Sequence, residues 1–174
     1  IEDQVFPKRC GFFEGKRCVP MAEHVQKIRA ALDARTDPDL VIIARTDAVA
    51  PNGWDDGVRR AEAYHEAGAD VVFVDGVKTM DDMDIYTRRL VEQGIPCLYN
   101  GQLLPAPEIA GRGFKIMITG GGHALSYAAV RQALLELKQG SGEGLGRDLD
   151  QFNTITSLLG LPEIYELEQR YAVD

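Results

Sequence analysis

The first ten residues gather side chains whose types and spacing could do chemistry. Glu2 and Asp3 are adjacent carboxylates, which could hold or orient a divalent cation directly or through water. Lys8 and Arg9 directly precede Cys10. Nearby cations lower the pKa of a thiol and raise its reactive thiolate fraction. This segment therefore indicates a reactive thiol beside a site for a metal ion or an anion.

The thiol lies in a stretch that has its own glycine and proline residues. Gly11 follows Cys10 and lets the backbone approach a ligand closely. Residues 5–20 are predicted to form a long loop, a candidate lid over an active site. Taken alone, Lys-Arg-Cys-Gly also fits an ordinary charged surface loop with an incidental cysteine.

Polar residues close each of four short apolar runs further along the chain. The runs are 40–44, 71–74, 97–99 and 114–118, and the polar residues that follow them are Arg45, Asp47, Asp75, Asn100 and Thr119. In α/β barrels the chemistry lies at the carboxyl ends of the strands. Each residue taken singly is read as the start of a solvated loop, but together they favour one shared site.

The elements that must position these residues alternate between two patterns. Continuous apolar runs of this length suit strands that are buried on both faces of a parallel sheet. Stretches with helical spacing or strong helix formers lie around and between them, at 20–35, 54–67, 80–93, 105–110 and 124–138. The alternation predicts the βα repeat of a parallel α/β protein.

The C-terminal part has a different character. Residues 139–147 contain four glycines and are predicted to be a flexible linker. Two further helices are expected at about 148–159 and 162–170. The predicted organisation is therefore an α/β unit at 1–138, a linker at 139–147 and C-terminal helices at 148–174.

Composition and charge exclude several classes of function. The 174 residues include 19 Lys and Arg against 27 Asp and Glu, for a net charge of −8. This balance gives no basic footprint for nucleic acid or for an anionic membrane surface. No apolar run approaches the roughly 20 residues of a membrane span. Three cysteines without a CxxC pair indicate reduced thiols, so we expect a cytoplasmic protein.

Three stretches taken together resemble a known superfamily. They are IEDQVFPKRCG at 1–11, ARTDA at 44–48 and RAEAYHEAGAD at 60–70. The chain is similar to the isocitrate lyase and phosphoenolpyruvate mutase superfamily, and its motifs most resemble those of the 2-methylisocitrate lyase-like branch. KRCG together with ARTDA at this separation is a specific signature. The lyases and carboxyphosphonoenolpyruvate mutases of the superfamily carry the cysteine, whereas the phosphoenolpyruvate mutases lack it.

The resemblance implies a (β/α)8 TIM barrel with Mg²⁺, or Mn²⁺, at its C-terminal rim. A closed barrel needs eight strands and typically about 250 residues. Because this chain offers four whole strands and the end of another, we expect it to be the C-terminal part, from the end of strand 4 to strand 8, plus extra helices. The direct metal ligands would lie upstream of Ile1. The extra helices fit a homo-oligomer, a dimer or tetramer, that exchanges them between subunits.

The resemblance also implies roles for the N-terminal residues. Glu2 would lie near the metal and act largely through metal-bound water. Lys8 and Cys10 would lie on the gating loop at 5–20. Cys10 would protonate the enolate that forms when a carbon–carbon bond breaks. Gly11 would offer its backbone amide to a substrate carboxylate.

The strand ends receive roles in the same way. Arg45 would bind a substrate carboxylate, because its planar fork matches two oxygens. Asp75 and Asn100 would line the pocket floor. The sequence departs from the superfamily pattern at three places. Phe12 replaces a usual His, Asp75 replaces a usual Glu, and a Gly-rich segment ending in Thr-Pro is missing after Asn100.

Three functions remain open from the sequence. The first is a Mg²⁺-dependent lyase that cleaves a 2-hydroxy di- or tricarboxylate, such as 2-methylisocitrate or an alkylmalate, to a 2-oxo acid and a carboxylate. The second is oxaloacetate decarboxylation or hydrolysis, or phosphonate chemistry of the carboxyphosphonoenolpyruvate mutase type. The third is a catalytically silent, barrel-derived binding protein. The expected partner of the enzymes is a small carboxylate.

Overall fold

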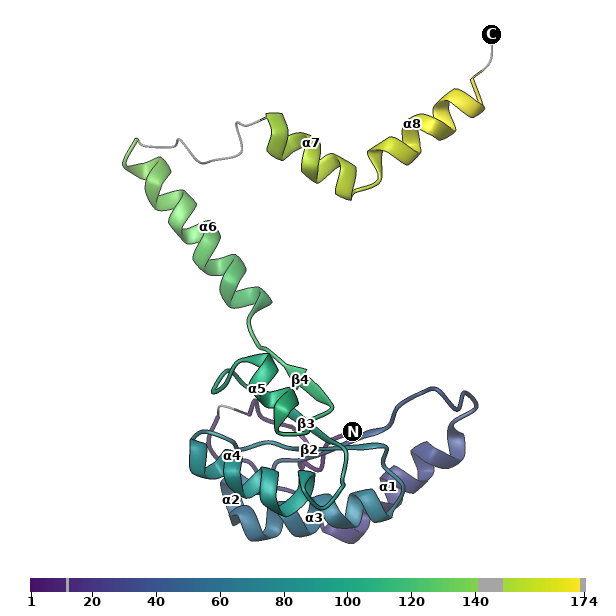
Figure 1. The fold of residues 1–174 in the computed structure, drawn as a ribbon, viewed down its shortest axis with the longest axis vertical. Coiled ribbons are helices and arrows are strands. Elements are labelled where there is room, and N and C mark those ends of the chain that lie inside the picture. The colour runs from purple at the N-terminus through teal and green to yellow at the C-terminus, as the bar shows by residue number, and fades with distance from the viewer. Residues whose placement is uncertain (12, 141–148, 173–174) are drawn as a thin grey trace. The chain divides into compact units, whose positions relative to one another are not determined.

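The computed structural model describes residues 1–11, 13–140 and 149–172. The chain divides into two compact units, residues 1–120 and residues 121–174. Figure 1 shows the first unit as a layer of strands with helices packed beside it, and the second as helices alone. No helix in the described residues is long and apolar enough to cross a membrane.

A four-stranded parallel sheet forms the centre of the first unit. Its order, β1-β2-β3-β4, follows the sequence, and each strand pairs in parallel with the next. The strands are β1 (Ile43–Thr46), β2 (Val71–Val74), β3 (Cys97–Asn100) and β4 (Ile116–Ile118). The predicted parallel α/β repeat is confirmed. The first strand begins three residues later than its apolar run, because Leu40 and Val41 are exposed and unpaired with β2.

Helices precede the sheet and connect its strands. They are α1 (Met21–Ala34), α2 (Val49–Asn52), α3 (Trp54–Glu66), α4 (Met80–Tyr86) and α5 (Ala106–Gly111). The helix expected at 80–93 continues from α4 into a π-helical turn, η1 (Thr87–Val91). Thr79 and Asp82 form a capping box that satisfies backbone N–H groups at the start of α4. The short α2 had no signal in the sequence.

The first residues extend the sheet beside β1. Glu2 forms a parallel bridge with Arg45, and the Asp3 amide donates to the Arg45 carbonyl over 3.1 Å. The Arg45 amide in turn donates to the Ile1 carbonyl over 2.8 Å. Residues 1–3 therefore have the strand-end position that the sequence indicated, next to the strand that carries Arg45.

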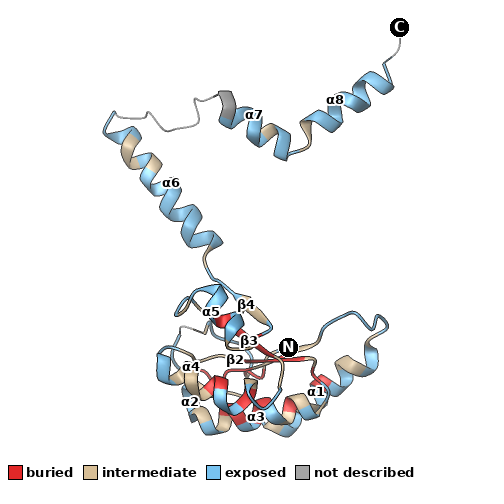
Figure 2. Cartoon of the chain, viewed as in Figure 1, coloured by how far each residue is buried: buried red, intermediate tan, exposed pale blue. Residues whose placement is uncertain are grey.

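The two faces of the sheet have different neighbours. Val72, Val74, Cys97 and Tyr99 form one core cluster with side chains of α3, α4, η1 and α5. Because side chains alternate along a strand, the residues between them lie on the opposite face. There Val71, Phe73 and Leu98 pack together with Ile43 and Ile116. Figure 2 shows the buried residues gathered in the strands and on the sides of the helices that face them.

The second unit consists of α6 (Gly122–Lys138), α7 (Leu149–Leu158) and α8 (Leu161–Arg170). The helix predicted at 124–138 and the two predicted C-terminal helices are therefore present. Gly160, in the left-handed region at φ 85°, makes the turn between α7 and α8. The predicted linker at 139–147 lies largely outside the described residues, and its boundaries and the helix exchange stay predictions.

Candidate functional site

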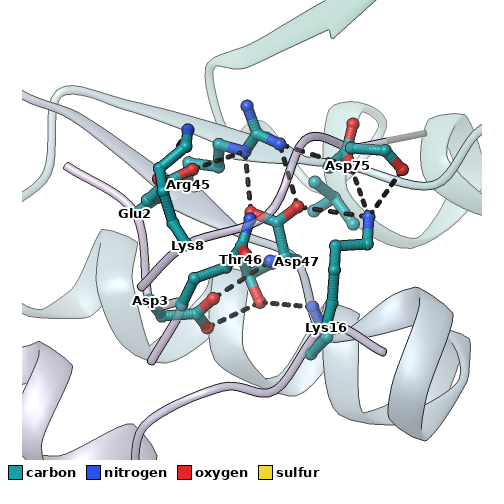
Figure 3. Close-up of polar contacts among 12 residues, drawn as sticks. Glu2, Asp3, Lys8, Lys16, Arg45, Thr46, Asp47 and Asp75 are labelled. Carbon is teal, nitrogen blue, oxygen red and sulfur yellow. Dashed lines mark hydrogen bonds and ion pairs between the residues drawn. The ribbon is translucent and has the colours of Figure 1, made fainter. Parts of the chain in front are cut away.

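Arg45 stands at the centre of a cluster of charged side chains at the carboxyl ends of β1 and β2 (Figure 3). Its Nε and Nη2 atoms donate to the two carboxylate oxygens of Asp47, each over 2.8 Å. This fork-to-fork geometry fixes the plane of the guanidinium. Nη2 also lies 3.3 Å from Oδ2 of Asp75. The guanidinium carbon lies 4.9 Å from the ring centre of Phe73, a contact that adds cation–π attraction.

One edge of that guanidinium remains open. Among the described residues, no hydrogen bond or ion pair involves Nη1 of Arg45. The Arg45 side chain keeps 21% of its surface exposed. Nη1 can therefore donate to an incoming anion while Nε and Nη2 keep their partners.

Glu2 and Lys8 form a second pair beside this cluster. Nζ of Lys8 lies 2.7 Å from one Glu2 oxygen, and Nε of Arg45 lies 3.5 Å from the other. The Lys8 side chain is 57% exposed, so water screens its charge. Lys8 therefore joins the loop to Glu2 through a contact that can be exchanged at low cost.

The predicted loop at 5–20 is held together by its own hydrogen bonds. The Gln4 side chain accepts from the amide of Arg9 over 2.8 Å and donates to its carbonyl over 2.9 Å. Nη1 of Arg9 donates to the Glu14 carbonyl over 2.8 Å, and the Phe13 amide donates to the Cys10 carbonyl over 2.9 Å. Cys10 itself is exposed. The described residues of the loop thus present a free thiol from a backbone that these hydrogen bonds hold.

Gly11 lies directly against the charged cluster. A Cβ atom at this position would meet Oδ2 of Asp75 at 2.8 Å and Nη2 of Arg45 at 3.4 Å. A side chain at position 11 would displace the loop or the carboxylate. The close approach predicted for Gly11 is therefore made by the loop to the ends of β1 and β2.

Lys16 closes the loop on the sheet. Its Nζ atom donates to the Gly11 carbonyl over 2.9 Å, to Asp75 over 2.9 Å and to Asp47 over 3.3 Å. Only 3% of its side chain is exposed. Lysine is almost never fully buried unless its charge is paired, and here both neighbours are carboxylates.

Burial and charge act in opposite directions on this cluster. Burial by itself would raise the pKa of Asp47, but hydrogen bonds from Arg45 and the charges of Arg45 and Lys16 outweigh it and lower the pKa. Burial by itself would lower the pKa of Lys16, but Asp75 and Asp47 outweigh it and raise the pKa. The pKa of Arg45 is raised in the same way. Asp47, Lys16 and Arg45 therefore stay ionised around neutral pH.

Asp3 holds the end of β1 from the side that faces α3. Its buried carboxylate accepts from the Asp47 amide over 3.0 Å and from the Thr46 hydroxyl over 2.8 Å. It also accepts from Arg60 over 3.1 Å and from Tyr64 over 2.7 Å, both on α3. Asp3 thus fixes the end of β1 on α3 and does not face the loop. Glu2 and Asp3 therefore do not face a common point, because neighbouring side chains on a strand point to opposite sides, and the role of Glu2 at a metal through water stays a prediction.

Asn100 ends β3, the next strand along the sheet. The segment that follows is short and is closed by its own contacts. The Leu103 amide donates to the Tyr99 hydroxyl over 3.1 Å, and the Gln102 side chain donates to the Gly120 carbonyl over 2.9 Å. These contacts lie in the part of the chain that, from the resemblance, lacks the Gly-rich segment expected after Asn100.

The structure brings most of the predicted site residues together. Contacts join Glu2, Lys8, Gly11, Arg45 and Asp75 into one cluster. Cys10 lies beside Gly11 in the chain, and Asn100 is placed at the same edge by its strand. Phe12 lies outside the described residues. Sequence reasoning missed Lys16, which no local pattern marked, and it noted Asp47 as a strand-end residue without assigning it to the site.

The described residues do not form a metal site by themselves. They contain no group of three or more His, Cys, Asp or Glu side chains positioned to hold a metal ion. Each carboxylate of the cluster faces a cation of the protein: Glu2 faces Lys8, Asp47 faces Arg45 and Asp75 faces Lys16. This arrangement does not fit direct coordination of Mg²⁺ by the described side chains.

Curated relatives match nearly the whole chain. They include the petal death protein of Dianthus caryophyllus, 37% identical over 98% of this chain, and 2,3-dimethylmalate lyase of Eubacterium barkeri, 33% identical over 99%. A 2-methylisocitrate lyase of Shewanella oneidensis is 36% identical over 95%. The chain spans 55%, 61% and 56% of the length of these three proteins, respectively.

Solved structures agree with these relatives. Oxaloacetate acetylhydrolase in complex with 3,3-difluorooxalacetate superposes with a TM-score of 0.81, at 29% identity over 97% of this chain and 59% of that one. Phosphonopyruvate hydrolase in complex with oxalate and Mg²⁺ gives a TM-score of 0.78, at 31% identity over 98% of this chain and 61% of that one. The parallel sheet with its helices is thus the fold of barrel enzymes of the phosphoenolpyruvate mutase and isocitrate lyase superfamily.

The match extends to a defined family. Residues 1–138 match the family described as phosphoenolpyruvate phosphomutase, and this range includes the loop, all four strands and α6. It holds every residue of the charged cluster. The chain belongs to the phosphoenolpyruvate phosphomutase family, within the phosphoenolpyruvate mutase and isocitrate lyase superfamily.

Proposed function

We propose that the protein carrying this chain is a lyase that cleaves a carbon–carbon bond of a 2-hydroxy di- or tricarboxylate, of the 2-methylisocitrate or alkylmalate type. The observation that supports the proposal is the close approach of Gly11 to the Arg45–Asp75 pair, since Gly11 directly follows the exposed Cys10 in the chain. Relatives named 2-methylisocitrate lyase and 2,3-dimethylmalate lyase support it.

In this proposal the residues divide the work between binding and proton transfer. Nη1 of Arg45 binds one substrate carboxylate, and the Gly11 amide and Lys8 contact the substrate from the loop. Asp75 and Asn100 line the floor of the pocket. Cleavage of the carbon–carbon bond leaves the electron pair on one fragment as an enolate, and the Cys10 thiol donates the proton that completes the product. The hydroxyl of the other fragment loses its proton to water as its oxygen becomes the carbonyl of the departing 2-oxo acid.

Dependence on Mg²⁺ or Mn²⁺ is part of the proposal and rests on the superfamily. The related phosphonopyruvate hydrolase is described with oxalate and Mg²⁺. A metal would supply charge stabilisation for the developing enolate. Because the described carboxylates are already paired with cations, Glu2 would contact the metal through water. The roles of Cys10, Arg45 and Lys8 are independent of the metal.

The test is a product assay on the purified full-length protein with MgCl₂. 2-Methylisocitrate and 2,3-dimethylmalate are supplied separately, and release of a 2-oxo acid is followed by proton NMR. Cys10→Ala is expected to abolish release, whereas Cys18→Ala, a matched loss of a thiol eight residues later, is expected to retain it. Absence of a 2-oxo acid from both substrates with the wild-type protein would contradict the proposal.

A second candidate has its own support. Oxaloacetate acetylhydrolase and phosphonopyruvate hydrolase superpose on the chain, and the short segment after Asn100 differs from the pattern expected of the lyases. The same assay with oxaloacetate and phosphonopyruvate separates the two by product. Cys10→Ala should largely spare a decarboxylase. A silent binding protein would give no product from any of the four compounds and no heat of binding for oxalate with Mg²⁺ in calorimetry.

A further inference from the structure

Lys16 is the buried cation of the loop, and its three acceptors come from three different segments. They are the backbone of Gly11, the carboxylate after β2 at Asp75 and the carboxylate after β1 at Asp47. Figure 3 shows the Lys16 side chain reaching toward both carboxylates from the side opposite Arg45. An ammonium has three donors, and these three contacts use all of them.

The hydrogen bonds of Lys16 link the loop to the strand ends. Among the described residues, Lys16 makes the only hydrogen bonds that join residues 8–16 to the ends of β1 and β2. The other bonds of the loop are internal or reach residues 2–5, as in the pairs of Gln4 with Arg9 and of Lys8 with Glu2. The position of the loop over the strands therefore depends on this one ammonium.

We propose that Lys16 is the positioning residue of the site, which fixes the Cys10–Gly11 segment on the carboxyl ends of β1 and β2. Its bond to the Gly11 carbonyl orients the peptide that follows Cys10. Its bonds to Asp75 and Asp47 bridge the two carboxylates and keep both in place for Arg45. Lys16 acts through these residues and does not itself contact the reacting atoms.

Loss of the ammonium has a defined consequence. Asp47 and Asp75 would share Arg45 as their one remaining cation, and the open Nη1 edge would be drawn toward Asp75. The Gly11 carbonyl would lose its buried donor. Both changes move the thiol segment relative to Arg45, and a shift of about 1 Å in a catalytic group can cost about 100-fold in rate.

The test compares three variants of the full-length protein. Lys16→Met keeps most of the unbranched side chain and removes its charge, and Lys16→Arg keeps the charge. Lys115→Met removes an exposed lysine before β4, at the other end of the strands, as a control. Peptide-resolved hydrogen exchange over residues 5–19 reports on the loop, where the Phe13 amide is bonded to the Cys10 carbonyl. Steady-state kinetics, with whichever of 2-methylisocitrate and 2,3-dimethylmalate the wild-type protein cleaves, gives kcat and KM.

Lys16→Met is expected to raise exchange in residues 5–19 by about tenfold or more while peptides of α3 and β2 stay protected. The value of kcat should fall by about tenfold or more with KM changed far less, and Lys16→Arg should restore part of both. Unchanged exchange in the loop, or equal loss in Lys16→Met and Lys115→Met, would overturn the inference. A rise throughout the protein would overturn it too, because it would mark Lys16 as a residue of general stability.

The kinetic measurement alone rests on the proposed function. If the wild-type protein releases no 2-oxo acid, the proposed function fails, while the exchange data still decide whether Lys16 holds the loop. If the enzyme is active and kcat is unaffected in Lys16→Met, the positioning role fails and the proposed function stands.

Discussion

Replacing Asp3 by Asn tests whether the site depends on the buried carboxylate beneath it. Oδ2 of Asp3 accepts from Thr46, Arg60 and Tyr64, and Oδ1 accepts from the Asp47 amide. An asparagine keeps one acceptor oxygen and replaces the other by an NH₂ group. The oxygen will face the three donors, which places the NH₂ against the Asp47 N–H.

The magnitude follows from these contacts. The variant leaves one buried N–H without an acceptor, which costs about 1–3 kcal/mol. It also removes one carboxylate from Arg60, whose side chain is 9% exposed, although Asp56 remains 2.9 Å from its Nε. Breaking a buried ion pair costs about 3–5 kcal/mol, and the remaining Asp56 contact reduces that figure. We expect Asp3→Asn to lower the free energy of unfolding by about 3 kcal/mol.

Urea unfolding followed by circular dichroism measures the effect. With an m value of about 2 kcal/mol/M, the midpoint should fall by about 1.5 M. Asp33→Asn, on the exposed side of α1, removes the same charge and should shift the midpoint little. Adding Arg60→Met to Asp3→Asn should cost less than the sum of the two single changes, because each removes the partner of the other. A loss below about 1 kcal/mol for Asp3→Asn would refute the reasoning.

Three further changes test other parts of the first unit. Gly11→Ala forces Asp75 or the loop to move, since its Cβ would lie 2.8 Å from the carboxylate, so kcat in the proposed assay should fall about 100-fold while Gly111→Ala leaves it unchanged. His24 is fully buried and has no hydrogen-bond partner among the residues that the structure describes, and burial lowers its pKa. The unfolded chain therefore takes up the proton first as pH falls below about 6.5, so wild-type stability should decrease from there, and His24→Phe should remove that decrease in urea midpoints measured at pH 7 and 5. Burial raises the pKa of Cys18 and Cys97 to about 12, so iodoacetamide at pH 8 should label the exposed Cys10 first, which peptide mass spectrometry will show or contradict.

The sequence was sufficient for the fold because its signals were local and repeated. Each apolar run is followed by a polar residue and then by a stretch of helix formers, and the parallel sheet places all strand ends at one edge. That geometry alone brings Arg45 and Asp75 together, since Arg45 pairs in register with Phe73, two residues before Asp75. The position of residues 1–3 beside β1 follows from the same pattern.

The rest of the site depends on contacts between distant residues. Lys16 is 6% exposed only because the loop folds back over Asp47 and Asp75, which lie 31 and 59 residues later. Nothing in the sequence around Lys16 distinguishes it from an exposed lysine. Asp3 was misread for a related reason, because its inward direction is set by pairing with β1 and by Arg60 and Tyr64 on α3.

The charges of the site decide which of its cations can change partner. Three cations, Lys8, Lys16 and Arg45, face three carboxylates, Glu2, Asp47 and Asp75, so the cluster is neutral before any ligand enters. Separating Lys16 from Asp47 would leave two buried charges without each other, since their side chains are only 3% and 0% exposed, and this costs stability. The pair of Lys8 with Glu2 is largely solvated and contributes about 0–1 kcal/mol. We therefore expect an incoming carboxylate to recruit Lys8 from the loop and the open edge of Arg45, while Lys16, in the role proposed for it, keeps the loop in place.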